Sequence, residues 1–298
     1  MAGERIAFLG LGAIGRPMAV RVARQFPLTV WNRTRSRTDP FAAETSARVA
    51  ATPADAVRDA DVVMTCLSTS KDVESLLPGP DGLLAGLRPG TLFLDCTSGD
   101  PATSRRVAEQ LEAHRVAFAD CPVSGGTNGA EAGILTVMVG ASPAVFARAK
   151  PFLQTFGKLI VHVGDIGAGD TIKAVNQVLL AANILTLGEA LTAMVKAGVP
   201  ARAGLEVLNA SSGRSFVSES LIPARVLTGT WPNTFRLALL DKDVGIATDL
   251  VRQLDLDAPL LEQVEQHIKA AREALGEGAD YLEPIKLNEA RAGVEVRG

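Results

Sequence analysis

A glycine-rich segment near the start of the chain has the residue types and the spacing of a phosphate-binding turn. It reads Gly10-Leu11-Gly12-Ala13-Ile14-Gly15 and fits the pattern G-x-G-x-x-G. The segment follows an apolar run typical of a strand and precedes a helical pattern, which is the context that this pattern requires. The first glycine then permits a tight turn, the second lets the backbone approach a pyrophosphate, and the third lets the helix pack closely on the sheet. These six residues are therefore predicted to bind a dinucleotide; an ordinary turn of small residues is the alternative.

The residues after the second predicted strand bear on which dinucleotide is bound. In NAD-binding domains an acidic residue about 20 positions further on accepts hydrogen bonds from the ribose hydroxyls. Here that position holds Asn32, followed by Arg33 and Thr34, with further arginines at positions 35 and 37. Guanidinium and hydroxyl groups suit a 2′-phosphate, which a carboxylate would repel. We therefore expect NADP(H) to be preferred over NAD(H), with a solvated basic loop as the alternative.

Lys173 has the sequence setting of a proton-transferring side chain. It lies near the start of a long apolar helical pattern, and Asn176 follows three residues later on the same helix face. Lysines are rarely buried without a partner, and burial together with the positive potential of a helix N-terminus would lower the pKa of the ammonium group. Such a lysine suits general acid/base catalysis. A lysine that extends from the helix end into solvent is the alternative.

A second glycine turn could hold a carboxylate. Ser124, Gly125 and Gly126 follow a predicted strand and precede Thr127. Successive backbone N–H groups in such a turn form an anion-binding concavity, and the two hydroxyl groups add hydrogen-bond donors. Because the Ser-Gly-Gly sequence is common, a plain glycine turn is the alternative.

These residues require a scaffold, and the sequence pattern indicates two different ones. Short β-rich runs alternate with helical patterns over the first half of the chain. The predicted strands are residues 5–9, 28–31, 61–65, 91–94, 115–119, 135–139 and 159–163. This alternation indicates an α/β domain of the Rossmann type with a doubly wound, largely parallel sheet. After Asp170 almost only helical patterns remain, so an all-α domain is expected there.

The predicted boundary gives a dinucleotide-binding domain at residues 1–164 and a helical domain for substrate binding and oligomerisation at residues 165–298. A long helix over residues 170–197 is predicted to join them. Further helices are predicted at residues 203–209, 218–227, 237–254 and 260–275. The long helix is apolar over much of its circumference, so we expect it to be buried inside the protein or against another subunit. Asn176, Gln177, Asn183 and Glu189 interrupt its apolar run, which favours a soluble helix over a membrane span.

Composition excludes several classes of function. The 298 residues carry a net charge of −3, and no run of lysine and arginine dominates a segment, so neither a nucleic-acid nor a membrane partner is indicated. The three cysteines and three histidines are widely spaced and match neither a disulfide framework nor a metal site. We therefore expect no metal, and a reducing, cytoplasmic location.

Together, the motifs resemble those of the β-hydroxyacid dehydrogenases, the family that includes the 3-hydroxyisobutyrate dehydrogenase group. Four segments carry the resemblance in order along the chain: GLGAIGRPMA (Gly10–Ala19), DCPVSGGTNGAEAG (Asp120–Gly133), GAGDTIKAVNQ (Gly167–Gln177) and Lys242-Asp243 followed by Ala247. The chain departs from the family pattern at Ile14, where Met is usual, at Cys121, where Ala is usual, and at Gln177, where a second Asn is frequent. The stretch WNRT, residues 31–34, resembles the NADPH-preferring glyoxylate and succinic semialdehyde reductases within the family.

The resemblance implies a reaction and the residues that perform it. Hydride would pass between NADP(H) and a small carboxylate-bearing semialdehyde or a β- or γ-hydroxy acid. Lys173 would be the general acid/base, and Asn176 would orient the substrate. The substrate carboxylate would be held by Ser124, Gly125 and Gly126. A homodimer or homotetramer is also implied.

On the cofactor side, the resemblance implies that Lys242 approaches the cofactor from the second domain. Ser98 would lie near the nicotinamide, in a Thr97-Ser98 pair that inverts the family's Ser-Thr order. The wall of the substrate pocket is expected to include residues 211–216 and Phe235. There Arg214 is either a second carboxylate clamp or a surface residue.

Three other functions stay open at this stage. An imine reductase shares the architecture, but those enzymes usually lack the lysine found here at position 173. A 6-phosphogluconate-type dehydrogenase would have His in place of Val175 and a larger helical domain. A non-catalytic dinucleotide-binding scaffold would need neither Lys173 nor the Ser-Gly-Gly turn.

Overall fold

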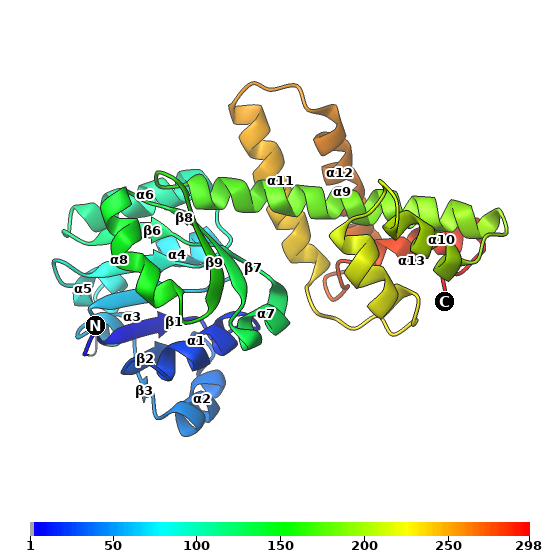
Figure 1. The fold of residues 1–298 in the computed structure, drawn as a ribbon. Coiled ribbons are helices and arrows are strands. Elements are labelled where there is room, and N and C mark those ends of the chain that lie inside the picture. Colours follow the sequence, from blue (N-terminus) through cyan, green and yellow to red (C-terminus); the bar gives the residue numbers. More distant parts are fainter. Residues whose placement is uncertain (1–2) are drawn as a thin grey trace. The chain divides into compact units, whose positions relative to one another are not determined.

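The computed structural model describes residues 3–298, and the first half of the chain is an α/β domain (Figure 1). Within the described residues the strands form one nine-stranded sheet. The strands are β1 (Ile6–Leu9), β2 (Leu28–Trp31), β3 (Arg48–Val49), β4 (Val62–Thr65), β5 (Leu92–Asp95), β6 (Ala117–Asp120), β7 (Val123–Ser124), β8 (Leu135–Gly140) and β9 (Gly157–Gly164). Their order is β3-β2-β1-β4-β5-β6-β8-β7, and β9 pairs with β8. The first six strands pair in parallel, whereas β6 and β7 both pair antiparallel with β8.

Helices cover both faces of this sheet. They are α1 (Gly15–Ala23), the short 3₁₀ helix η1 (Arg35–Arg37), α2 (Thr38–Thr45), α3 (Pro53–Val57), α4 (Ser70–Ser75), α5 (Leu83–Gly86), α6 (Pro101–Glu112), α7 (Gly126–Ala132) and α8 (Pro143–Leu153). The chain runs from β1 to β2 on one side of the sheet centre and from β4 to β5 on the other. The order therefore reverses between β1 and β4, which is where open α/β sheets bind ligands at the carboxyl ends of their strands.

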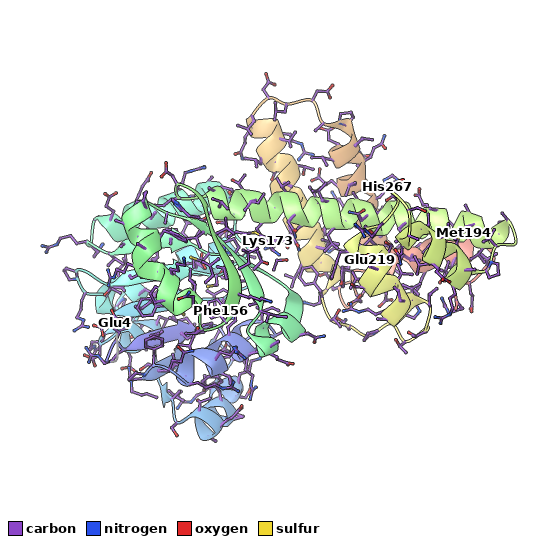
Figure 2. The ribbon with its side chains drawn as sticks, in the orientation of Figure 1. Glu4, Phe156, Lys173, Met194, Glu219 and His267 are labelled. Carbon is purple, nitrogen blue, oxygen red and sulfur yellow. The ribbon has the colours of Figure 1, made fainter. Side chains whose placement is uncertain are left out.

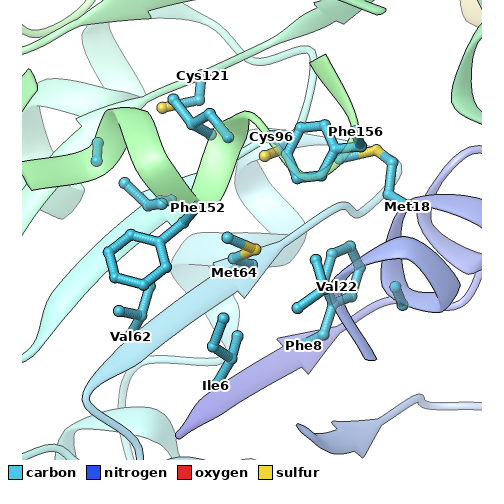
Figure 3. Close-up of a cluster of buried hydrophobic side chains, with 14 of the residues drawn as sticks. Ile6, Phe8, Met18, Val22, Val62, Met64, Cys96, Cys121, Phe152 and Phe156 are labelled. Atoms are coloured by element: carbon cyan, nitrogen blue, oxygen red, sulfur yellow. The ribbon is translucent and has the colours of Figure 1, made fainter. Parts of the chain in front are cut away.

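Alternating strand residues enter two separate cores, as a sheet covered on both faces requires. On β1, Ile6 and Phe8 join Met18 of α1 and Phe152 of α8 in one core (Figure 3). Residues 7 and 9 of the same strand point to the other face, where α3, α4, α5 and α6 supply Val57, Val73, Leu83 and Val107, and the segment after α4 supplies Leu77. The predicted fold class, a Rossmann-type sheet followed by helices, is confirmed.

The long helix α9 (Ala168–Lys196) has 29 residues and is about 43 Å long. The chain divides into two compact units inside this helix, after Lys173, and the predicted boundary at residues 164 and 165 lies shortly before this division. The reason is that the first turn of α9 belongs to the sheet domain, because Asp170 bonds the backbone of Gly99 and the hydroxyl of Ser104.

The second unit, residues 174–298, is helical with its own core. After α9 come α10 (Ala201–Asn209), η2 (Val217–Val226), α11 (Leu237–Gln253), α12 (Pro259–Leu275) and α13 (Pro284–Ala292). Four of these were predicted. The helix η2 differs in its winding, because it is a π-helix with Pro223 inside, and the N–H of Leu227 reaches back five residues to the carbonyl of Ile222.

Strands β3 and β7 and helix α13 are among the elements that were not predicted. Strands β3 and β7 have two residues each, too few for an alternating pattern. Helix α13 has weak amphipathic periodicity, because polar and apolar residues are mixed along its sequence, PIKLNEARA, and a pattern search therefore misses it.

Helix α9 is also long and apolar enough to cross a membrane, alone in this respect among the described residues. Length and composition are the only grounds, and the same test is passed by core helices of soluble proteins. The core of the helical unit contains residues of α11 and α12 together with six residues of α9: Ala174, Val178, Ala181, Ile184, Leu187 and Leu191.

Candidate active site

The glycine-rich turn lies at the carboxyl end of β1, at the point where the strand order reverses. Gly10 has φ +106°, which L side chains rarely adopt, and a Cβ there would overlap the carbonyl oxygen of Cys66 at the end of β4. A Cβ at Gly15 would overlap the carbonyl oxygen of Gly10. Close packing therefore requires both glycines.

The middle of the same turn is open. A Cβ built at Gly12 has no atom within 4 Å, so the backbone there is accessible to a ligand. Ala13 is exposed and Ile14 half-buried, whereas Leu11 belongs to the core. The arrangement fits a pyrophosphate group, which needs uncovered backbone next to the start of a helix.

Asn32 at the end of β2 is a support for this turn. Its Oδ1 accepts a hydrogen bond of 2.9 Å from the backbone N–H of Leu11, and its Nδ2 donates to the carbonyl of Thr34. The adjoining basic loop is exposed, and the side chain of Arg33 is 83% exposed with its guanidinium 3.4 Å from Asp72. Cationic groups at the end of β2 are thus accessible, while the Asn32 amide is engaged with protein groups.

The ends of β4 and β5 are tied together by a buried carboxylate. Oδ1 of Asp95 accepts hydrogen bonds from the hydroxyl of Thr65 and from the backbone N–H of Thr97. The Thr97 hydroxyl in turn accepts from the N–H of Leu67. This network fixes the start of the loop that carries Ser98, which is half-buried.

The Ser-Gly-Gly turn joins β7 to α7. Strands β6 and β7 run along the same neighbour, since Asp120 pairs with Gly140 and Ser124 pairs with Thr136 of β8. Two successive positive φ values follow, +134° at Gly125 and +64° at Gly126. Both glycines are exposed, so their backbone is accessible. Cys121, at the break between the two strands, is buried, and burial raises the pKa of its thiol well above the ordinary value.

Lys173 is buried, with 8% of its surface exposed, and lies within the first two turns of α9 (Figure 2). It belongs to the sheet domain, as the Gly-rich turn, Ser98 and the Ser-Gly-Gly turn do. The alternative of a lysine extended into solvent is therefore contradicted by its burial.

In the helical unit, two predicted site residues belong to one hydrogen-bonded chain. Nδ2 of Asn176 donates to Oε1 of Gln177 over 3.1 Å, and Nε2 of Gln177 donates to Oδ2 of Asp243 over 2.9 Å. Nζ of Lys242 forms an ion pair of 2.8 Å with Oδ1 of the same carboxylate. Asp243 is 4% exposed. Through these contacts its carboxylate fixes Asn176 on α9 relative to Lys242 on α11.

Other residues singled out in the sequence lie elsewhere. Arg214 is exposed, and its guanidinium is 3.8 Å from Glu219 on η2. Among residues 3–298, no cluster of three or more His, Cys, Asp or Glu side chains has the arrangement of a metal site.

Comparison with known proteins finds a matching family model for each half of the chain. Residues 5–164 match the model of the NAD-binding domain of 6-phosphogluconate dehydrogenase, and residues 167–288 match that of the NAD-binding domain of NADP-dependent 3-hydroxyisobutyrate dehydrogenase. The 3-hydroxyisobutyrate dehydrogenase of Pseudomonas aeruginosa is 33% identical over 95% of this chain and 97% of its own length. The chain belongs to the β-hydroxyacid dehydrogenase family. It is an oxidoreductase that uses a nicotinamide dinucleotide.

Two further members are similar over the whole chain. The 2-(hydroxymethyl)glutarate dehydrogenase of Eubacterium barkeri is 36% identical over 99% of this chain and 98% of its own. The structure of Mycobacterium tuberculosis 3-hydroxyisobutyrate dehydrogenase with L-serine superposes with a TM-score of 0.87, at 29% identity, covering 96% of this chain and 99% of that one.

For this member of the β-hydroxyacid dehydrogenase family, the structure shows contacts of three carboxylates that lie within the motifs but had no predicted role. Asp120, Asp170 and Asp243 are buried carboxylates bonded to segments that carry predicted site residues. The sequence signal was their polarity within apolar surroundings. Their partners are 47 to 71 residues away, so no local pattern identifies them.

Proposed function

We propose that the chain is an NADP(H)-dependent dehydrogenase that interconverts a small carboxylate bearing a β- or γ-hydroxyl group and the corresponding semialdehyde, with Lys173 as general acid/base. The observation that carries the proposal is the burial of Lys173 at the start of α9, in the same domain as the Gly-rich turn. Lysines are seldom buried to this degree, and an amine withdrawn from solvent near a helix N-terminus suits proton transfer.

The proposed role of Lys173 is to move one proton at the reacting oxygen. In the oxidation direction the neutral amine takes the hydroxyl proton; in the reduction direction the ammonium group donates a hydrogen bond to the carbonyl and then its proton to the forming alkoxide. A bound nicotinamide supplies hydride acceptance or donation. General acid/base catalysis of this kind contributes roughly 10²–10⁴-fold to the rate.

The proposed anion site for the substrate is the Ser-Gly-Gly turn, with Asn176 orienting the substrate. Its glycines are exposed, and the hydroxyl of Ser124 adds a donor. The substrates named for the relatives, 3-hydroxyisobutyrate and 2-(hydroxymethyl)glutarate, both carry a primary alcohol β to a carboxylate. L-Serine, present in the similar solved structure, has the same arrangement. A carboxylate clamp would hold any of these with its hydroxyl at a fixed distance.

The proposed preference for NADP(H) is supported by the exposed guanidinium of Arg33 and by the absence of a carboxylate at position 32. The second family model is likewise described for an NADP-dependent enzyme. A cation at this place favours the 2′-phosphate, and an aspartate would repel it. We further propose Ser98 and Lys242 as cofactor-binding residues, and a cytoplasmic location.

The test is a matrix of two coenzymes and several substrates. Oxidation of NADPH and NADH is followed with glyoxylate and succinic semialdehyde. Reduction of NADP⁺ and NAD⁺ is followed with 3-hydroxyisobutyrate, 2-(hydroxymethyl)glutarate and L-serine. We expect turnover, with kcat/KM at least tenfold higher for the phosphorylated coenzyme. Turnover with NAD(H) alone would contradict the coenzyme preference but not the Lys173 mechanism.

Absence of turnover with every pair would contradict the proposal. An NADPH titration by fluorescence and a cyclic imine substrate then separate the remaining possibilities. Binding without any turnover supports a non-catalytic dinucleotide-binding role, and reduction of the imine alone supports an imine reductase.

A further inference from the structure

Two buried carboxylates join the segments of the sheet domain that carry the proposed site residues. Asp120 ends β6, four residues before Ser124. Its Oδ1 accepts a hydrogen bond of 2.7 Å from the backbone N–H of Gly167, and its Oδ2 accepts one of 2.9 Å from the N–H of Asp170. Both donors belong to the N-terminus of α9, so a residue 47 to 50 positions away caps the helix that carries Lys173.

The backbone around the Asp120 carboxylate is shaped to admit it. A Cβ at Gly140 of β8 would lie 2.5 Å from Oδ1, and a Cβ at Gly169 of α9 would lie 2.7 Å from Oδ2. Real Cβ atoms do not approach that closely, so both positions must lack a side chain. The carboxylate is thus enclosed between a strand and a helix, and it sets the distance between them.

Asp170 continues the connection to the third segment. Its Oδ1 accepts a hydrogen bond of 3.0 Å from the N–H of Gly99, the residue after Ser98. Its Oδ2 accepts one of 2.6 Å from the hydroxyl of Ser104 on α6. Asp170 lies three residues before Lys173 on α9, so both are on one face of the helix.

The N-terminus of a helix can be capped without a carboxylate from a distant part of the chain. Four other helices of the domain are capped by the side chain of the residue that precedes them, namely Thr52, Thr69, Asp100 and Ser142. Burying two neighbouring carboxylates is costly, because removal from water and mutual repulsion disfavour their charged forms. A distant cap has a different effect, which is to fix α9 relative to the strand that leads into the Ser-Gly-Gly turn.

We propose that Asp120 and Asp170 are positioning residues of the reaction, which together fix Lys173 relative to Ser98 and to the Ser124–Gly126 turn. This inference rests on the proposed function. Asp120 fixes the start of α9 relative to the Ser124–Gly126 turn. Asp170 fixes the same helix relative to the loop that carries Ser98. A small displacement of the proton-transferring group is known to cost about 10²-fold in rate, so the expected effect is on kcat.

Asp170 offers a pair of variants that separates geometry from charge. In Asp170→Asn, Oδ1 can still accept from Gly99, and Nδ2 can donate to the Ser104 oxygen. Asp170→Ala loses both contacts. We expect kcat of the alanine variant to fall by roughly 10²-fold, with KM for NADPH within about threefold of the wild type, and the asparagine variant to stay within about fivefold in kcat.

Asp120 offers a graded series, because an asparagine can accept from only one of the two helix N–H groups. We expect kcat to fall about tenfold in Asp120→Asn and further in Asp120→Ala. Asp55→Ala is the matched control in the same domain. That carboxylate also accepts a backbone N–H, from Ala51, and pairs with Arg48, but it contacts no predicted site segment. Its removal should lower the melting temperature and leave kcat unchanged.

The readouts distinguish the possible failures. Circular dichroism and NADPH titration establish that each variant is folded and binds coenzyme. If wild type turns over while Asp170→Ala and Asp120→Ala keep its kcat, this inference is wrong and the proposed function stands. If Asp55→Ala, at a similar loss of melting temperature, lowers kcat as much as Asp120→Ala and Asp170→Ala do, the carboxylates are merely structural and the inference is again wrong. If wild type has no turnover, the proposed function itself fails, and the inference with it.

Discussion

At the scale of single residues, Lys173 carries most of the chemical argument. Its side chain is buried near the start of a helix, in the same domain as the two turns proposed to hold the coenzyme and the substrate carboxylate. Each turn contains a glycine with a φ that L side chains rarely adopt, +106° at Gly10 and +134° at Gly125.

Lys173→Ala is expected to lower kcat by at least 10²-fold, because the variant has no amine to accept the proton from the reacting hydroxyl group or to donate one to the carbonyl oxygen. The Kd for NADPH should stay within a few fold of the wild-type value, since the glycine-rich turn is untouched. Steady-state kinetics and a fluorescence titration measure the two quantities. Near-normal turnover would contradict the role of this lysine.

Arg33→Asp is expected to raise KM for NADPH at least tenfold and to leave KM for NADH nearly unchanged. The substitution replaces an exposed cation at the end of β2 with an anion that repels the 2′-phosphate. Arg148→Asp makes the same charge change at an exposed position of α8 and is the control. Equal effects of both variants would show that only net charge matters.

At the scale of elements, helix α9 is held at its start by Asp120 of β6 and, in the helical unit, by Asp243 of α11. Each contact joins a helix to an element distant in sequence through a buried carboxylate. The cost of removing each carboxylate from water is offset only while every partner is present. Loss of one partner should therefore lower the free energy of unfolding by a measurable amount.

Gln177→Leu removes the amide that donates to buried Asp243 and is expected to lower the free energy of unfolding by about 1–3 kcal/mol. Asn183→Leu is the control on the same helix, because that exposed amide donates to the helix's own backbone at Leu179. Its effect should be below about 0.5 kcal/mol. Urea unfolding compares the two, and equal destabilisation would contradict the importance of the buried bridge.

The start of α9 also predicts a dependence of stability on pH. Burial raises the pKa of Asp170 well above its ordinary value, and the neighbouring Asp120 raises it further. The folded state therefore binds this proton more tightly than the unfolded chain, which has a pKa of about 4. The resulting stability is complete below about pH 4 and is lost as pH rises through the pKa of the folded state.

Asp170→Asn removes that titration and retains the two hydrogen bonds. The free energy of unfolding of the variant should therefore increase relative to wild type as pH is raised from about 4.5 to 7.5. Urea titrations over this range measure the difference. A difference that is constant or decreases with pH would contradict the assigned direction of the shift.

At the scale of the whole molecule, apolar side chains remain on the surface of α9. Leu179 is 53% exposed and Val175, one turn earlier, is 37% exposed. Exposed apolar stripes of this kind are typical of subunit interfaces. We propose that a second copy of the chain covers this stripe in a homodimer or homotetramer.

Leu179→Arg is expected to shift the protein towards monomers, because a guanidinium would have to be buried against the second copy. Light scattering at micromolar concentration measures the mass of wild type and variant. A wild-type monomer, or a variant that keeps the wild-type mass, would contradict the proposed interface.

The sequence by itself determined the class of the fold, the main strands and helices, the glycine-rich turn and the place of Lys173 on a helix. These features are local, because steric limits, periodicity and the special backbone of glycine act within a few residues. It also predicted a boundary at residues 164 and 165, which lies before the division that the structure shows.

Only the tertiary structure decided which polar groups meet inside the protein. Asp120 reaches the start of α9 across 47 residues, Asp170 reaches Gly99 across 71, and Gln177 reaches Asp243 across 66. Such pairs depend on how strands and helices are brought together, and burial then makes each unpaired group costly. For that reason the sequence revealed the groups proposed to react, whereas the groups that hold them in place became visible only in the folded chain.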